Sequence, residues 1–137
     1  WDTHANQARN LPNALNELST AILTLKEGLG PVWTKTAVLC LTEFGRTVDE
    51  NGSHGTDHGT GGAAVFAGGA LKGGQILGDW PGLGPGYLYR DRDLMPTRDV
   101  RAFAAWALAG LFPVKHGDLE ASIFPDLDMG EDPGLLA

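Results

Sequence analysis

The chain contains little cysteine, little positive charge and no long apolar run. A single cysteine, Cys40, excludes an internal disulfide, and its place in the apolar run 36–41 predicts a small buried side chain. No apolar stretch reaches the roughly 18 to 20 residues that a membrane-spanning helix requires. Seventeen acidic residues against ten basic ones give a net charge of −7, and no segment concentrates Lys or Arg. We therefore expect neither nucleic acid nor an anionic membrane surface as a partner.

The remaining composition is that of a globular protein. Hydrophobic residues make up 42% of the 137 residues, and the 20 glycines are dispersed among apolar runs, which argues against disorder. A chain of this length suits one domain with its own core. We therefore expect residues 1–137 to form a single α/β unit.

Apolar periodicity predicts two helices and several short strands. Residues 6–28 carry a stripe typical of an amphipathic helix, formed by Leu11, Leu15, Leu18, Ile22 and Leu25. The run 36–41 resembles a buried parallel strand, and residues 63–67 and 75–77 are strand candidates compatible with a hairpin. A second helical stripe follows Thr97, the expected N-cap, and ends at Pro113.

Two short clusters combine carboxylate and imidazole groups, namely Asp2 with His4, and Asp57 with His58. Glu43 lies between them in the sequence, directly after the predicted strand 36–41, at the edge where open α/β folds bind ligands. Mixed oxygen and nitrogen donors favour Zn or Mn over Ca or Mg as a divalent metal. Each pair is also compatible with ordinary turn chemistry, in which Asp caps the backbone and His is solvated.

The segment 48–62 is a polar, glycine-rich loop, longer than the usual connection of about 4 to 6 residues. Its glycines permit close backbone approach around Asp57 and His58, although they are equally compatible with loop filler. Arg46, just before this loop, either forms a surface ion pair with Glu43 or recognises phosphate or sulfate oxygens with its planar guanidinium. No Ser-His-Asp triad, phosphate-binding loop or dinucleotide fingerprint can be assigned.

Four motifs together resemble the bacterial family known as domain of unknown function 1501: Trp-Asp-Thr-His at 1–4, Thr-Glu-Phe-Gly-Arg-Thr at 42–47, Gly-Thr-Asp-His-Gly-Thr-Gly-Gly at 55–62 and Gly-Asp-Trp-Pro-Gly at 78–82. The resemblance implies a relation to the alkaline phosphatase and sulfatase superfamily. The expected fold is then the carboxyl-terminal portion of an alkaline phosphatase-like α/β sandwich, with a partial, mostly parallel sheet.

The resemblance also implies how the metal ligands are divided. Asp2 and His4 would form the first group, Glu43 the strand-end carboxylate, and Asp57 with His58 the later contribution. In an alternative alignment, Asp57 and His58 themselves correspond to the Asp-His pair of the superfamily.

The function implied is that of a metal-dependent hydrolase region acting on a phosphate or sulfate ester. Arg46 would hold the oxyanion, whereas the nucleophile would come from residues outside this chain or from water, because Cys40 lies inside a predicted strand. The expected partners are a small-molecule ester and either a missing amino-terminal portion or a second copy of the chain, in the periplasm or outside the cell. The alternative is a non-catalytic metal-binding or structural protein that retains the fold.

Overall fold

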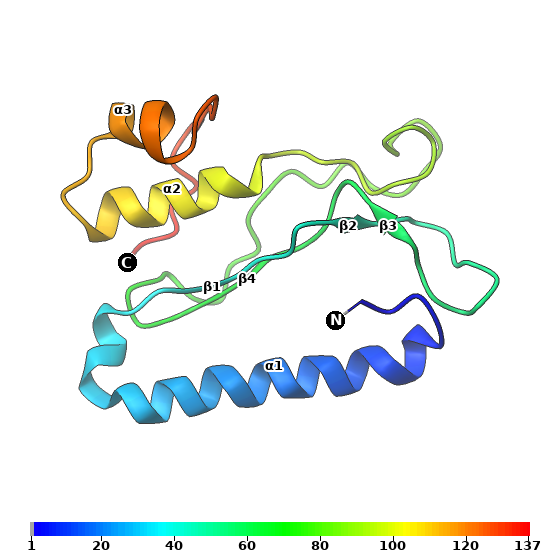
Figure 1. Ribbon diagram of the computed structural model, residues 1–137, viewed down its shortest axis with the longest axis horizontal. Coiled ribbons are helices and arrows are strands. Elements are labelled where there is room, and N and C mark those ends of the chain that lie inside the picture. Colours follow the sequence, from blue (N-terminus) through cyan, green and yellow to red (C-terminus); the bar gives the residue numbers. More distant parts are fainter. Residues whose placement is uncertain (1) are drawn as a thin grey trace. The chain divides into compact units, whose positions relative to one another are not determined.

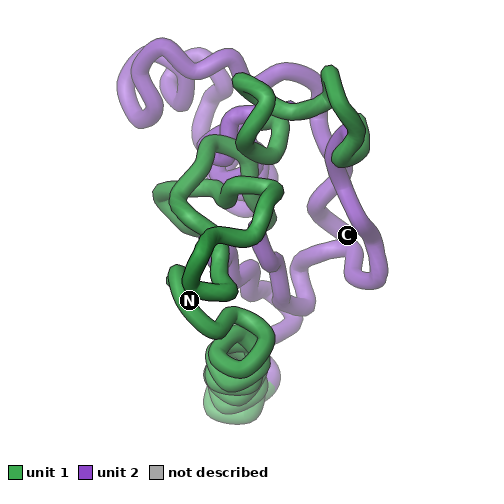
Figure 2. The backbone as a smooth tube through the Cα atoms, turned by 90° about the vertical axis from the view of Figure 1, so that its right-hand side faces the viewer, with its two compact units in different colours: residues 1–30, 42–63, 80–96 green, residues 31–41, 64–79, 97–137 purple. Residues whose placement is uncertain are grey.

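The computed structural model describes residues 2–137, and its contacts divide the chain into two compact units. Unit 1 comprises the chain up to residue 30 together with residues 42–63 and 80–96, and unit 2 comprises residues 31–41, 64–79 and 97–137 (Figure 2). Helices and small antiparallel sheets together give a mixed α/β class, as the sequence predicts. The expectation that all 137 residues form one unit stays a prediction.

Unit 1 begins with the long helix α1 (Gln7–Leu29), which confirms the helix predicted from the apolar stripe (Figure 1). The stripe is only partly covered, since Leu15 and Leu25 remain 49% and 46% exposed. The helix ends at Gly30, whose positive φ of 50° suits a residue without a side chain. Neither α1 nor any other helix in the described part of the chain combines the length and apolar character needed to cross a membrane.

The sheet of unit 1 consists of β2 (Gly45–Arg46) and β3 (His58–Gly59), which pair antiparallel with Arg46 opposite His58. A Cβ at Gly45 would overlap the backbone of Gly61, so the close approach of these segments requires glycine. Among the described residues of unit 1, the buried ones other than glycine are all polar. They are Thr3, Thr47 and Asp93. Backbone hydrogen bonds and glycine contacts therefore hold this unit together more than an apolar core does.

The sheet of unit 2 contradicts the predicted parallel arrangement. After a 3-10 helix (Gly30–Lys35), β1 (Val38–Cys40) pairs antiparallel with β4 (Val65–Ala67), with Leu39 opposite Phe66. Both sheets of the described chain have two strands and are antiparallel, so the expected mostly parallel sheet is wrong. A short apolar run reports burial but not strand direction. Cys40 is half-buried, not buried as predicted.

The predicted hairpin between residues 63–67 and 75–77 is also wrong. Residues 65–67 do form β4, but residues 75–77 are not a strand, and Ile76 is fully exposed. Gly74 has a positive φ of 72°, and the preceding Lys72 donates its backbone N–H to the carbonyl of Leu135 at 2.8 Å. The segment therefore leaves the sheet instead of turning back along β4.

Unit 2 contains α2 (Val100–Leu111), α3 (His116–Asp118) and a π-helical turn (Leu119–Ile123). Asp99, not Thr97, is the N-cap of α2, because its carboxylate accepts the backbone N–H of Arg101 at 2.8 Å. The apolar core of this unit lies between α2 and the segments after it and comprises Ala102, Ala105, Leu119, Leu127 and Met129.

Candidate metal centre

The first residues of the described chain are attached to the glycine-rich loop by backbone hydrogen bonds. Thr56 donates its N–H to the carbonyl of Thr3 at 3.2 Å, and Asn6 and Gln7 donate to the carbonyls of Ser53 and His54 at 2.9 and 2.7 Å. Gly55 lies against the backbone of His4, and a Cβ there would overlap it, so this glycine is required for close approach and is not filler. These contacts place Asp2 and His4 beside β3.

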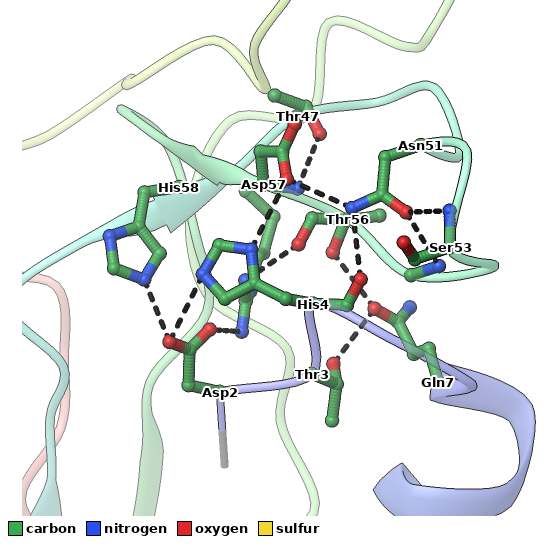
Figure 3. A network of polar contacts seen from close by, with 12 residues as sticks. Asp2, Thr3, His4, Gln7, Thr47, Asn51, Ser53, Thr56, Asp57 and His58 are labelled. Carbon is green, nitrogen blue, oxygen red and sulfur yellow. Dashed lines mark hydrogen bonds and ion pairs between the residues drawn. The ribbon is translucent and has the colours of Figure 1, made fainter.

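Three of the predicted ligands converge within unit 1. Oδ2 of Asp2 lies 2.9 Å from Nε2 of His58 and 3.2 Å from Nε2 of His4, and one donor atom from each residue lies within 4.8 Å of the others (Figure 3). The side chains are 40% to 49% exposed, so small ions can reach them. The arrangement joins a segment before α1 with strand β3.

His4 lies between two carboxylates. Its Nε2 faces Asp2 at 3.2 Å, and its Nδ1 faces Oδ1 of Asp57 at 3.1 Å. A neutral imidazole donates a hydrogen bond from only one of its two nitrogens. A neutral His4 therefore donates to only one of the two carboxylates, and its other nitrogen is left with a lone pair that can bind a cation.

Asn51 organises the loop around this pair. Its side-chain amide donates to Oδ1 of Asp57 and to the carbonyl of His4, both at 2.9 Å, while its Oδ1 accepts the backbone N–H groups of Ser53 and Gly55. Asp57 contacts Nδ1 of His4, the ring nitrogen that does not face Asp2, and is not among the three converging donors. Sequence reasoning missed Asn51, although Asn51-Gly52-Ser53 is typical of an Asx-turn.

The local charges keep both carboxylates anionic. The hydrogen bond from His58, followed by the hydrogen bond and the positive charge of Arg46, lowers the pKa of Asp2 below its ordinary value. Hydrogen bonds from Asn51 and then His4 lower the pKa of Asp57. Both groups are therefore in the form that binds cations at neutral pH.

Arg46 belongs to this cluster as an ion-pair partner. Its guanidinium contacts Oδ1 of Asp2 at 2.5 Å and donates to the carbonyl of Thr56 at 2.9 Å. Among the residues that the structure describes, Arg46 and Glu43 do not form the surface ion pair that the sequence also allowed. The role predicted for Arg46, holding an oxyanion, stays a prediction, but the guanidinium already balances the charge of Asp2.

Phe44 forms one wall of the cluster, a contact that sequence reasoning missed. Its ring stacks on His58 with centroids 3.8 Å apart and planes inclined by 12°, and the guanidinium of Arg46 lies 5.3 Å from its centroid. The only signal in the sequence is an aromatic residue between Glu43 and Gly45. Phe44 therefore restricts the orientation of the His58 ring.

Glu43 is not brought to the cluster. It is exposed, and the group of converging donors among residues 2–137 contains neither Glu43 nor Asp57. Its expected position depended on the carboxyl edge of a parallel sheet, and β1 is instead antiparallel to β4. The metal roles assigned to Glu43 and Asp57 from sequence stay predictions.

A family model described as "Protein of unknown function (DUF1501)" matches residues 1–105, a range that includes α1, the four strands of the described residues and the Asp2, His4 and His58 cluster. The chain belongs to this family. No curated protein and no solved structure matches it.

Proposed function

We propose that Asp2, His4 and His58 bind a divalent metal ion, and that the chain is the metal-binding region of a hydrolase acting on a phosphate or sulfate ester. The observation that carries the proposal is His4 lying between the carboxylates of Asp2 and Asp57, with Nε2 directed at the same oxygen as Nε2 of His58. Two imidazoles and one carboxylate form a donor set suited to Zn or Mn more than to Ca or Mg.

The two donor distances from Asp2 are compatible with such an ion, and the three donor atoms lie within 4.8 Å of one another. The two distances from Asp2 to the histidines are 2.9 and 3.2 Å, close to the roughly 3.3 Å between neighbouring ligands of a tetrahedral zinc ion with bonds of about 2.0 Å. Three protein ligands also correspond to the number found in catalytic zinc sites, which leave a position for substrate. The pair of Asp57 and His4 matches the arrangement in which a carboxylate accepts the N–H of a histidine ligand at the ring nitrogen that does not bind the metal.

The chemistry of the region divides between the ion and the side chains. A bound divalent ion would polarise the ester oxygen and offset negative charge on the leaving group. Asp57 and Asn51 orient the imidazole of His4, Phe44 restricts that of His58, and Arg46 balances the carboxylate of Asp2. The nucleophile is proposed to come from residues outside this chain or from water.

The relation to alkaline phosphatases and sulfatases, and a place in the periplasm or outside the cell, form part of the same proposal. They are supported by the resemblance of four motifs, at 1–4, 42–47, 55–62 and 78–82, to the DUF1501 family, and by the relation to that superfamily which the resemblance implies. A small-molecule ester, together with an amino-terminal portion or a second copy of the chain, would be the corresponding partners.

A non-catalytic metal-binding or structural role is the second candidate. The observation that favours it is the ion pair between Arg46 and Asp2, because a guanidinium occupied by a carboxylate is less able to hold the oxyanion of an ester. Metal binding without turnover of aryl phosphates and aryl sulfates, by protein that includes the natural flanking sequence, would favour this candidate over the hydrolase.

The metal proposal is tested by replacing His58 with alanine and measuring bound metal by elemental analysis after equilibration with Zn²⁺ or Mn²⁺ and gel filtration. The matched control is His54→Ala, because His54 is an exposed histidine of the same loop that pairs with Glu50 at 2.7 Å, away from the cluster. We expect stoichiometric metal in the original chain and in the control, and its loss in His58→Ala. Equal metal content in the two variants would refute the assignment.

A further inference from the structure

A pocket of about 320 Å³ lies within unit 1, and His58 is one of the residues that line it. The side chains that line it are polar or aromatic. They belong to His58, Thr60, Tyr89, Arg90, Arg92 and Asp93. Its volume is near the lower limit of small-ligand sites, about 300 to 1,000 Å³. The pocket therefore suits a small polar ligand, and His58 belongs both to it and to the candidate metal centre.

The turn that carries the two arginines has an unfavourable backbone conformation. Arg92 donates its N–H to the carbonyl of Tyr89 at 3.2 Å, and the two central residues, Arg90 and Asp91, have positive φ values of 54° and 55°. Turns of this kind normally use Asn, Asp or Gly at these positions, because most side chains disfavour the left-handed region, so Arg90 and not Asp91 is the unusual residue. The backbone at Arg90 would be less strained with Asn or Gly, so a role of the Arg90 side chain in the pocket would account for an arginine at this position.

Arg92 is held at the pocket by two contacts. Its guanidinium donates to the carbonyl of His58 at 3.1 Å and lies 3.4 Å from Oδ1 of Asp93. The Asp93 side chain is only 8% exposed, its Oδ2 accepts a hydrogen bond from Thr60, and its Oδ1 is buried without a hydrogen-bond partner. The charge of Arg92 is therefore what offsets this buried oxygen, which fixes the arginine in place.

The charges that line the pocket favour an anion. Arg90 and Arg92 contribute two positive charges, and Asp93 contributes one negative charge that faces Arg92. The guanidinium of Arg90 lies 5.2 Å from the ring centroid of Tyr89, so the aromatic side chain supports it. Two guanidinium groups on one short turn provide the planar donors that bind tetrahedral oxyanions.

We propose that this pocket binds the tetrahedral oxyanion of a sulfate or phosphate monoester, with Arg90 as the principal donor and Arg92, whose guanidinium also contacts Asp93, as a supporting positive charge. This assigns to the turn 89–92 the role that the sequence suggested for Arg46, whose guanidinium contacts Asp2. The pocket exceeds the size of the oxyanion alone, so the first atoms of the esterified group enter it beside Tyr89. The inference rests on the proposed function for the ester, whereas binding of the anion itself can be measured without metal.

The experiment is a titration of the isotope-labelled chain with inorganic sulfate and, separately, inorganic phosphate, in the presence of a metal chelator and followed by NMR chemical shifts. The test variant is Arg90→Asn, and the control is Arg9→Gln, which removes one positive charge from the exposed surface of α1. We expect saturable shifts at residues 58–60 and 89–93 and an affinity about tenfold lower, or more, in Arg90→Asn. Arg9→Gln should bind as the original chain does.

Thermal unfolding separates lost binding from lost structure. Asn adopts the left-handed region more readily than Arg, so Arg90→Asn should unfold at the same or a higher temperature than the original chain while binding the anion less tightly. Equal affinity in Arg90→Asn and Arg9→Gln, or shifts confined to other parts of the chain, would overturn the inference.

Failure of the metal proposal is distinguishable from failure of this one. His58→Ala that still binds zinc, with sulfate binding lost in Arg90→Asn, refutes the metal site alone. Loss of zinc in His58→Ala, with sulfate binding equal in the two arginine variants, refutes the oxyanion pocket alone.

Discussion

Replacing Asp57 with alanine separates two roles that the sequence does not distinguish, a direct metal ligand and a residue that orients a ligand. Asp57 contacts Nδ1 of His4 at 3.1 Å, whereas the converging donors are those of Asp2, His4 and His58. The structure therefore predicts weaker metal binding in Asp57→Ala, not its abolition. His58→Ala, which removes a converging donor, should abolish it.

The size of the effect follows from the exposure of the contact. Loss of a carboxylate that orients a metal-bound histidine lowers affinity by about 10- to 100-fold. The Asp57 side chain is 51% exposed, so solvent screens its charge. We therefore expect the lower part of that range, roughly 10- to 30-fold, for Asp57→Ala. Asp57→Asn should lose less, because an amide oxygen can still accept from His4 and Asn51.

The assay is a competition titration for Zn²⁺ against a chromophoric chelator, with Glu50→Ala as the control. Glu50 also pairs with a histidine of this loop, His54, at 2.7 Å, but that pair is apart from the cluster. An affinity of Asp57→Ala indistinguishable from that of Glu50→Ala would refute the orienting role. Complete loss of zinc, equal to that in His58→Ala, would show that Asp57 is a direct ligand and that the reasoning from the three converging donors is wrong.

Three further predictions concern the stability of the two units. Leu119 is fully buried in unit 2, so Leu119→Ala should lower the free energy of unfolding by about 2 to 5 kcal/mol in urea titrations; a change within the range of exposed substitutions would contradict the assigned core. Gly45→Ala should destabilise unit 1 strongly, because its Cβ would overlap the backbone of Gly61, whereas Gly52→Ala, with no atom within 4 Å, should unfold like the original chain; similar melting curves for both would count against the close approach. The carboxylate of Asp99 has its pKa lowered below 3.8, first by its hydrogen bond with Arg101, so its stabilisation of α2 is present above pH 3.8 and lost as the pH falls through the lower folded-state pKa. Asp99→Ala should therefore cost about 1 kcal/mol near neutral pH and show a smaller further loss on acidification, measured by thermal unfolding at each pH, and parallel pH profiles would exclude the cap.

The sequence predicts the helices of this protein better than its sheets. The apolar spacing from Leu11 to Leu25 reports a helical period directly, and α1 occupies Gln7–Leu29. Strand direction depends on which segment lies alongside, and nothing in the run 36–41 indicates that Val65–Ala67 is its antiparallel partner. The expected parallel edge, on which the predicted position of Glu43 depended, is wrong for this reason.

For the candidate site, the sequence predicts the kinds of donor groups but not how the fold arranges the residues around them. The donor types of Asp2, His4 and His58 are visible in the sequence, and the structure brings these three together. The positions of Asn51 and Phe44 depend on an Asx-type turn and on a ring stacking across segments, neither of which follows from residue spacing. The arginines of the turn 89–92 lie more than thirty residues after His58, so only the folded chain reveals the pocket that they share.

The backbone bonds between residues 3–7 and 53–56 have a consequence for how the cluster forms. His4 and Asp57 are 53 residues apart, and closing a flexible loop of that length costs roughly 3 to 4 kcal/mol of chain entropy. The hydrogen bonds that join Thr3, Asn6 and Gln7 to the glycine-rich loop offset part of that cost without a bound cation. A cation held by both segments would act as a cross-link that resists their separation, so its release should accelerate exchange of the amide protons of Asn6, Gln7 and Thr56 before it affects those of α2.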